Sequence, residues 1–326
     1  MATSAQLRVS GSAGSWYGTS GTADQQRPVR PTDRFRIGSV TKVFVATVVL
    51  QLAAERKVDL DRPVQQYLPG LLPPQLEPVT VSQLLNHTSG IPFEVGFPDV
   101  STPEKVLEHR YDQWTPSQRV ALIPNTKAKF TPGSQQEYRG INYVLAAMLI
   151  EKVTGHTYGH EVATRILCPL GLSHTYVPGA NETRIRGAHV HGYLNVPGRG
   201  LVDVSDFNTS RSYGEGDMIS TTGDLTRFAA ALFDGRLLPP HLLDKMFTVP
   251  RVSMVDGKSA SYSAGMQTFT INGVTVWGKT GEQYGYNAGL FSTRDQQRRI
   301  VYSFTPVARD ATQQQMTLRI AHAATS

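Results

Sequence analysis

The chain is poor in several features that would point to common classes of protein. It has one cysteine, Cys168, which excludes an internal disulfide, and the flanking Leu167 and Pro169 predict a buried thiol rather than a reactive one. The longest apolar stretch, residues 43–50, extends to residue 54 only through Gln51 and is too short to span a bilayer. The 32 basic residues are scattered among 26 acidic ones, so the net charge of +6 does not indicate a nucleic-acid surface.

Two further absences narrow the function. The opening residues, MATSAQLRVSGSAG, have neither the basic nor the apolar region of an export signal, so we expect a cytoplasmic protein with no membrane partner. No His-Glu-x-x-His motif and no cysteine cluster is present, so we expect no metal and no cofactor. His189 and His191 would be two ligands if they shared a strand face, but the sequence favours an ordinary surface strand, and His87 should order a turn rather than catalyse.

The first two thirds of the chain predict a hairpin followed by helices. With 326 residues and 40% hydrophobic content, the chain is long enough for one large domain or two lobes. β-forming residues around a Gly/Ser turn predict a hairpin over residues 6–10 and 14–18. Residues 39–57 carry apolar side chains on nearly all helical faces, which is typical of a buried helix. Residues 62–204 look helical or irregular and include a strongly amphipathic helix that stops at Gly155.

The last third changes in character. We expect a helix near residues 222–233, β-rich runs at 262–270, 273–277, 287–292 and 299–304, and a final helix over about residues 310–323. Strands so close in sequence predict an antiparallel meander. The sequence therefore predicts an α/β fold in which an antiparallel sheet is flanked by helices. Residues 1–61 and 205–326 would form this α/β lobe, residues 62–204 would form an inserted, mainly helical lobe, and one catalytic cleft would lie between them.

The tetrad SVTK at residues 39–42 places a hydroxyl and an amine three residues apart. In a helix the two side chains share one face, so the amine can accept the proton of the hydroxyl. Free backbone N–H groups and the positive end of the helix dipole favour a nucleophile that develops negative charge there. Such a tetrad arises about once by chance in a chain of this length, but this single example opens a buried helix. Ser39 is therefore the candidate nucleophile and Lys42 its base.

Acyl transfer also needs a second proton-handling group, because the leaving group must be protonated and the next acceptor activated. Tyr138 is our candidate, since the turn FTPG would leave it in an exposed bend where Lys42 and Lys279 lower its pKa. The triplet Lys279-Thr280-Gly281 follows the strand-like VTVW and should close an edge strand lining the cleft. Gly281 would let the substrate backbone lie close.

The residue after this triplet completes the predicted site. The backbone amide of Glu282 would pair with that of Ser39 as an oxyanion hole, which contributes about 10²- to 10³-fold per donor. Residues 273–280, GVTVWGKT, also satisfy the phosphate-loop pattern G-x-x-x-x-G-K-[ST]. We reject that interpretation because VTVW is strand-like and the following GEQYGYNAG cannot readily start a helix.

Four segments, FRIGSVTKVF, LLNHTSGIP, FTPGSQQEY and WGKTGEQYGYNAG, resemble in content and order the serine β-lactamase and penicillin-binding family. The likeness covers nearly the whole chain and is to the class C β-lactamases, the Streptomyces-type D-alanyl-D-alanine carboxypeptidases and the related esterases and transacylases. The resemblance implies an acyl-enzyme on Ser39, acid–base roles for Lys42 and Tyr138, and an electrostatic role for Lys279. It also implies the two-lobed fold described above.

Three positions that would contact substrate depart from the family pattern. Gly140 stands where the family usually has an Asn that contacts the lysine and holds the acyl amide of the substrate. Glu282 replaces a hydroxyl, and Gln267 occupies the approximate place of an arginine, in members that bind a terminal carboxylate. A carboxylate at position 282 beside a substrate carboxylate costs on the order of 1–4 kcal/mol. The site therefore looks hostile to peptidoglycan stems and β-lactams.

The sequence thus predicts a serine acyl-transfer enzyme that acts on a small-molecule ester or amide, with water or an amine as acceptor. It resembles the esterases and ester-to-amide transacylases of secondary metabolism, including antibiotic biosynthesis, and the residues do not decide between hydrolysis and transacylation. Two alternatives stay open. One is a D-alanyl-D-alanine carboxypeptidase or β-lactamase, and the other is a penicillin-sensor-like binding module that does not turn over.

Overall fold

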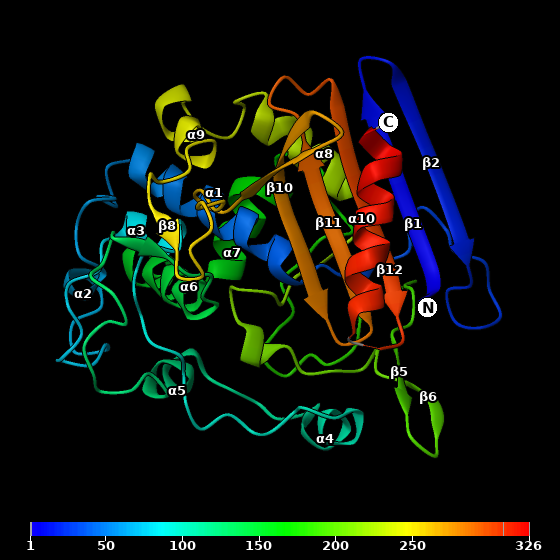
Figure 1. The fold of residues 1–326 in the computed structure, drawn as a ribbon, viewed down its shortest axis with the longest axis horizontal. Coiled ribbons are helices and arrows are strands. Elements are labelled where there is room, and N and C mark those ends of the chain that lie inside the picture. Colours follow the sequence, from blue (N-terminus) through cyan, green and yellow to red (C-terminus); the bar gives the residue numbers. More distant parts are fainter. Residues whose placement is uncertain (1, 309, 326) are drawn as a thin grey trace.

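The computed structural model describes residues 2–308 and 310–325 and is built around a six-stranded sheet of order β2-β1-β12-β11-β10-β9 (Figure 1). All five strand pairs are antiparallel. The strands are β1 (Ala2–Gly11), β2 (Gly14–Gly21), β9 (Gln267–Ile271), β10 (Val274–Gln283), β11 (Tyr286–Ser292) and β12 (Arg298–Pro306). The predicted hairpin and meander are both present, and the pairing of β1 with β12 joins the two ends of the chain in one sheet.

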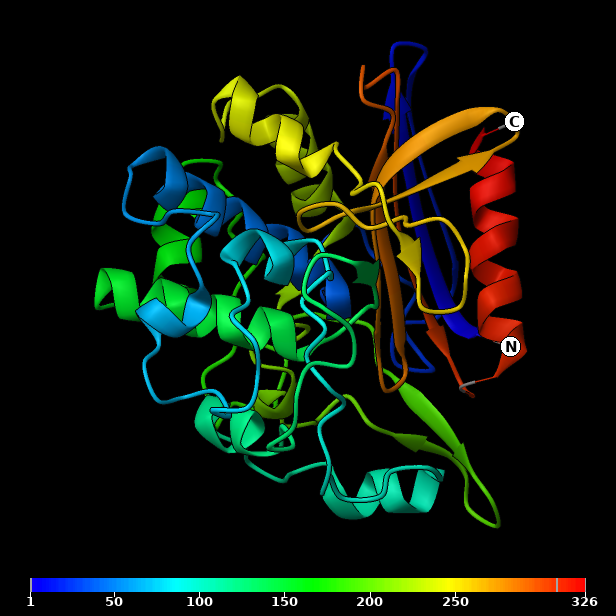
Figure 2. The ribbon, with the colours of Figure 1, turned by 60° about the vertical axis from the view of Figure 1, so that its left-hand side comes forward.

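Helices cover both faces of this sheet (Figure 2). Helix α10 (Ala311–Thr325) lies on one face, over an apolar cluster that includes Val276, Phe291 and Tyr302. Helices α1 (Thr41–Ala54) and α8 (Thr222–Phe233) lie on the other face, where they share the main core with strands β11 and β12. The predicted α/β class, with helices flanking an antiparallel sheet, is confirmed.

Helix α1 is shorter than the predicted helix over residues 39–57. A 3₁₀ turn, η1 (Gly38–Val40), precedes it, so Ser39 lies in this tight turn rather than in the α-helix itself. The helix ends at Ala54 because Arg56 adopts the left-handed conformation, with φ 58°, that commonly follows a helix C-terminus. Eleven of its residues are buried, which confirms its predicted central position.

Helix α6 (Ile141–Thr154) departs from the prediction of a strongly amphipathic helix. It buries residues on nearly every side, because one side contacts the main core and another contacts a second apolar cluster that includes Ile91 and Ile123. Gly155, with φ 77°, ends the helix at the predicted residue. The segment that follows gives a second correction, since Cys168 is exposed and not buried.

The remaining elements are short. The helices are α2 (Val64–Tyr67), α3 (Val81–Leu85), α4 (Pro103–His109), α5 (Pro116–Ala121), α7 (Tyr158–Val162), α9 (Pro240–Met246), the π-helical turn η2 (Ala163–Leu167) and the 3₁₀ turn η3 (Ser210–Ser212). The strands are β3 (Phe35–Arg36), β4 (Gln135–Gln136), β5 (Tyr193–Val196), β6 (Gly200–Asp203), β7 (Ile219–Ser220) and β8 (Ser253–Met254). In the part of the chain that the structure describes, no helix combines the length and the apolar character needed to cross a bilayer.

Strand β10 is longer than predicted and is not a simple edge strand. It pairs with β11 along residues 277–283, but its pairing with β9 ends at Gly278 opposite Gln267. Residues 279–283 therefore pair with β11 on one side, and no strand among residues 2–308 and 310–325 pairs with them on the other side. The strand continues through a turn at residues 284–285 into β11. A phosphate loop would instead lead into a helix, so its rejection is confirmed.

Candidate active site

The side chains of Ser39 and Lys42 lie in hydrogen-bond contact. Lys42 Nζ donates to Ser39 Oγ at 3.2 Å, although the serine is in turn η1 and the lysine is in helix α1. The lysine side chain is only 1% exposed, whereas Ser39 is half-buried. The predicted pairing of a hydroxyl with an amine on one face is present, and the amine is shielded from water while the hydroxyl remains accessible.

Tyr138 contacts the same hydroxyl. Its phenol donates to Ser39 Oγ at 2.7 Å, and Lys42 Nζ and Lys279 Nζ lie 5.1 and 4.7 Å from the centre of its ring. The residue is half-buried and not in the exposed bend that we expected. Burial raises the pKa of Tyr138, but the two lysines outweigh it, and the net effect is a lowered pKa, as predicted.

Lys279 is held beneath this tyrosine by Gln267. Its Nζ donates to Gln267 Oε1 at 3.0 Å and to the carbonyl oxygen of Thr280 at 3.2 Å. Burial lowers the pKa of Lys279, with Tyr138 acting against that effect and Lys42 adding to it. Gln267 is 6% exposed, so its amide is engaged in positioning a lysine rather than turned toward solvent.

At Gly281 and Glu282, the backbone of strand β10 packs against turn η1, which carries Ser39. A Cβ built on Gly281 would lie 1.9 Å from the carbonyl oxygen of Ile37, and one built on Gly38 would lie 2.4 Å from the backbone nitrogen of Glu282. The glycines therefore allow two backbones to touch, so the space at Gly281 is taken by this chain and not by substrate as we expected. The two predicted oxyanion donors belong to these adjoining segments.

Replacing Gly281 with alanine should push β10 away from Ser39. The added Cβ would lie 2.8 Å from the backbone nitrogen of Ser39, where neither backbone can yield easily. We expect kcat/KM for an activated ester to fall by about 10²-fold, because small displacements of reacting groups carry that cost. Urea unfolding should also show a loss of about 1–3 kcal/mol. Gly179→Ala, where the new atom meets nothing within 4 Å, is the control, and equal behaviour of the two variants would contradict the assignment.

Thr280 lies apart from the other predicted residues. It lines a small cavity beneath α10 together with Phe269 and Tyr302, whereas Lys279 lies in the site. Neighbouring residues of a strand point to opposite faces, which accounts for this separation. A direct role of the Thr280 hydroxyl in substrate binding stays a prediction.

Glu215 is a site residue that the sequence analysis missed. A Cβ built on Gly140 would lie 1.7 Å from Glu215 Oε2, so this carboxylate occupies the space that a side chain at position 140 would fill. Lys42 Nζ lies 3.6 Å from the same oxygen and donates to the Glu215 carbonyl at 2.6 Å. Glu215 thus supplies, from a distant segment, a polar contact to Lys42 that the glycine at position 140 does not make. No local motif around position 215 signals this.

The carboxylate of Glu215 belongs to a buried ionic network. Arg119 Nη1 donates to Glu215 Oε1 at 3.0 Å, and its Nε and Nη2 donate to Glu94 Oε1 at 3.0 and 2.6 Å. Arg139 lies 3.5 Å from the other oxygen of Glu94. Burial tends to raise the pKa of Glu215, but Lys42 and Arg119 outweigh it and lower that pKa, so the group is an anion at neutral pH.

His87 supports the site without reaching the reacting atoms. Its ring lies 4.5 Å from that of Tyr138, and its Nδ1 accepts the backbone N–H of Arg139 at 3.2 Å. Burial, with the charges of Lys42 and Lys279, lowers the pKa of His87 well below its ordinary value. The ring is thus neutral and orders the turn that carries Tyr138, in agreement with its predicted structural role.

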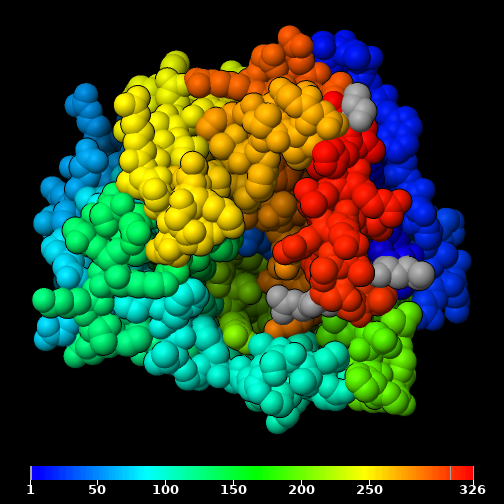
Figure 3. Space-filling view, in the orientation of Figure 1, coloured from blue at the N-terminus to red at the C-terminus, as the bar shows by residue number. Residues whose placement is uncertain are grey.

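A cavity of about 290 Å³ opens at Ser39. It is lined by Ser39, Val100, Phe207, Arg211, Ser212, Glu215, Gly216, Glu282, Gln283 and Tyr284. Figure 3 shows this face of the molecule hollowed between the cyan segment that includes α4 and the orange strands of the sheet. Two carboxylates, Glu215 and the exposed Glu282, line the cavity along with one arginine, Arg211.

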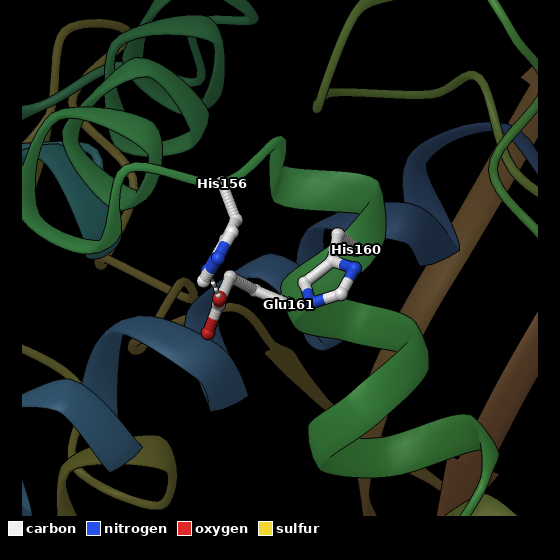
Figure 4. Close-up of side chains that lie close together, drawn as sticks. All are labelled: His156, His160 and Glu161. Atoms are coloured by element: carbon white, nitrogen blue, oxygen red, sulfur yellow. Dashed lines mark hydrogen bonds and ion pairs between the residues drawn. The ribbon is translucent and has the colours of Figure 1, made fainter.

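Histidines elsewhere gather at two places. His189 and His191 stack with ring centres 4.7 Å apart, but they precede β5 and do not share a strand as expected. Among the residues described, one group of three potential metal ligands was found, His156, His160 and Glu161 (Figure 4). Both histidines are exposed, and the buried carboxylate of Glu161 already accepts from Arg165 Nε at 2.5 Å, so an ion pair within the chain accounts for this carboxylate.

Comparison with known proteins agrees with this geometry. The sequence model of the Beta-lactamase family matches residues 3–325. The chain is 28% identical over 247 residues to a putative penicillin-binding protein, PbpX, of Bacillus subtilis, covering 75% of this chain and 56% of that protein. It is 25% identical to penicillin-binding protein 4* of the same organism, covering 85% of this chain and 62% of that one. The chain thus spans about three fifths of the length of these relatives.

Two solved structures are similar over almost their whole length. A D-stereospecific amidohydrolase from Streptomyces sp. is 37% identical with a TM-score of 0.86, covering 99% of this chain and 94% of that one. The D-amino acid amidase from Ochrobactrum anthropi SV3, complexed with D-phenylalanine, is 27% identical with a TM-score of 0.84, covering 100% and 95%. The fold and its site place the chain in the class of serine hydrolases with the beta-lactamase fold. The chain belongs to the beta-lactamase family.

Proposed function

We propose that this enzyme hydrolyses the amide or ester bond of a small D-configured amino-acid derivative through an acyl-enzyme on Ser39. The observation that carries the proposal is the convergence of Lys42 Nζ and Tyr138 Oη on Ser39 Oγ, at 3.2 and 2.7 Å. The similarity to the amidohydrolase and the amidase supports the substrate class. Ser39 and Lys42 come from the expected α/β lobe, residues 1–61 and 205–326, and Tyr138 comes from the expected helical lobe, residues 62–204. We propose that the two lobes form one catalytic unit.

The proposed reaction has two halves. Ser39 Oγ attacks the carbonyl carbon while its proton passes to Lys42 or Tyr138, and the backbone amides of Ser39 and Glu282 stabilise the oxyanion. The amine or alcohol leaves with a proton from Tyr138. Water then attacks the acyl-enzyme, the same groups take its proton, and Ser39 is released with the acid. Lys279 supplies positive charge beneath Tyr138 throughout.

The exposed carboxylate of Glu282 favours a positively charged substrate group over a carboxylate, whereas the charge of Glu215 is already balanced by Lys42 and Arg119. Gln267 contacts Lys279, so it does not offer the carboxylate anchor that an arginine would provide. Glu282 is exposed and, with Glu215, lines the cavity that opens at Ser39. A substrate carboxylate beside Glu282 would be repelled, whereas an ammonium group would be attracted. A free amino group on the acyl donor therefore fits this cavity.

A second candidate function is transfer of the acyl group to an amine, and Glu282 favours it. An exposed carboxylate at the mouth of the cavity raises the local concentration of a cationic acceptor. The ester-to-amide transacylases considered from the sequence would use this attraction. Adding an amine during ester turnover and looking for an amide product separates transfer from hydrolysis.

The proposed function is tested by comparing four substrates. D-phenylalanine amide, L-phenylalanine amide, an acyl-D-alanyl-D-alanine peptide and benzylpenicillin should be assayed with the wild type and with Ser39→Ala as the blank. We expect the D-amide to exceed the L-amide in kcat/KM by at least about tenfold, and the two carboxylate-bearing substrates to react at least about tenfold more slowly than the D-amide. Rapid penicillin hydrolysis that depends on Ser39 would instead support the carboxypeptidase or β-lactamase alternative. A stable adduct without release would support the sensor.

A further inference from the structure

Position 140 is a glycine because of space and not because of backbone conformation. Its φ of −64° and ψ of −43° suit any L-amino acid. The obstacle is Glu215, whose carboxylate oxygens and carbon would lie 1.7 to 2.9 Å from an added Cβ. A side chain at position 140 therefore requires the Glu215 carboxylate to leave the place it occupies here.

The carboxylate of Glu215 is placed so that it can fix the catalytic amine. Lys42 Nζ has two contacts with this residue, one to its carbonyl oxygen at 2.6 Å and one to Oε2 at 3.6 Å. The other carboxylate oxygen, Oε1, accepts a hydrogen bond from Arg119 Nη1 at 3.0 Å. Since Arg119 is in turn bound to Glu94, the carboxylate has little freedom to move away from the lysine.

We propose that Glu215 is the positioning residue that holds Lys42 Nζ against Ser39 Oγ, and that Glu215 and Gly140 form a matched pair in which either position can supply the polar contact. This proposal depends on the proposed function in one respect only, namely that Lys42 acts on Ser39. Without the carboxylate, the amine keeps its contact to the Glu215 carbonyl but loses the charged partner that limits its rotation.

The test uses a double-mutant cycle at these two positions. Glu215→Ala should lower kcat for p-nitrophenyl acetate by about 10²-fold with little change in KM, because proton transfer and not binding is impaired. Gly140→Asn alone should lower kcat by at least the same factor, because the new side chain displaces the Glu215 carboxylate from its place. In the double variant the asparagine enters the emptied space and contacts the lysine. Its kcat should exceed that of either single variant by at least about tenfold.

The controls separate positioning from folding. Thermal unfolding followed by circular dichroism shows whether each variant is folded, and Glu182→Ala removes a remote carboxylate that pairs with Arg186, so its kcat should stay within about twofold of the wild type. Losses that simply add in the double variant, or wild-type kcat in Glu215→Ala, would overturn the inference. A wild type that shows no Ser39-dependent ester turnover would overturn the proposed function, and this inference with it.

Discussion

Replacing Ser39 with alanine should reduce kcat/KM for an activated ester by about 10⁴-fold or more, since removing a nucleophile leaves only the residual contribution of binding and oxyanion stabilisation. The change deletes the one oxygen that receives hydrogen bonds from both Lys42 and Tyr138. Steady-state kinetics with p-nitrophenyl acetate and with D-phenylalanine amide measures the loss for an ester and for an amide.

The matched control is Ser12→Ala, since Ser12 is exposed and lies in the turn between β1 and β2. Its kinetics should equal those of the wild type. Circular dichroism with thermal unfolding should show that both variants are folded and unfold cooperatively. Substantial turnover by Ser39→Ala would mean that another group carries the acyl transfer.

Replacing Tyr138 with phenylalanine should reduce kcat by about 10²- to 10⁴-fold, which is the usual contribution of a group that transfers protons. The variant loses the hydroxyl 2.7 Å from Ser39 Oγ but keeps the ring that both lysines contact. Because the pKa of Tyr138 is lowered, the pH profile of the wild type should contain a group that titrates below the ordinary tyrosine value of about 10. This titration should be absent from the variant.

Tyr262→Phe is the control for Tyr138→Phe. The ring of Tyr262 packs against that of Tyr138 with centres 5.1 Å apart, and burial raises its pKa to about 12. Its substitution should change kcat far less and should leave the pH profile in place. If both variants behaved alike, the aromatic packing, and not the Tyr138 hydroxyl, would be what catalysis needs.

The parts of the fold and site that follow from neighbouring residues could be predicted from the sequence. The hairpin and the meander depend on short turns between β-forming runs. The contact between Ser39 and Lys42 depends on three-residue spacing, and it survives although the serine lies in a 3₁₀ turn. The lowered pKa of Tyr138 was also predictable, because its two cationic neighbours belong to motifs that must converge on one nucleophile.

Features that depend on long-range packing were not predictable. Glu215 fills the space at Gly140 from 75 positions further along the chain, and nothing near either residue signals this contact. Helix α6 looked amphipathic because its pattern does not show that a second apolar cluster covers its other side. Cys168 is exposed despite apolar neighbours, since those neighbours alone do not define which side faces the core. The cytoplasmic location stays a prediction.

The central claim is most directly tested by trapping the covalent intermediate. The wild type is mixed with excess activated ester, quenched in acid within the first turnover, digested, and mapped by mass spectrometry. We expect one acyl group on the peptide that contains Ser39, and no acyl group on the corresponding peptide of Ser39→Ala treated in the same way. Turnover without any adduct on that peptide, or an adduct on a different residue that forms and decays at the rate of turnover, would contradict it.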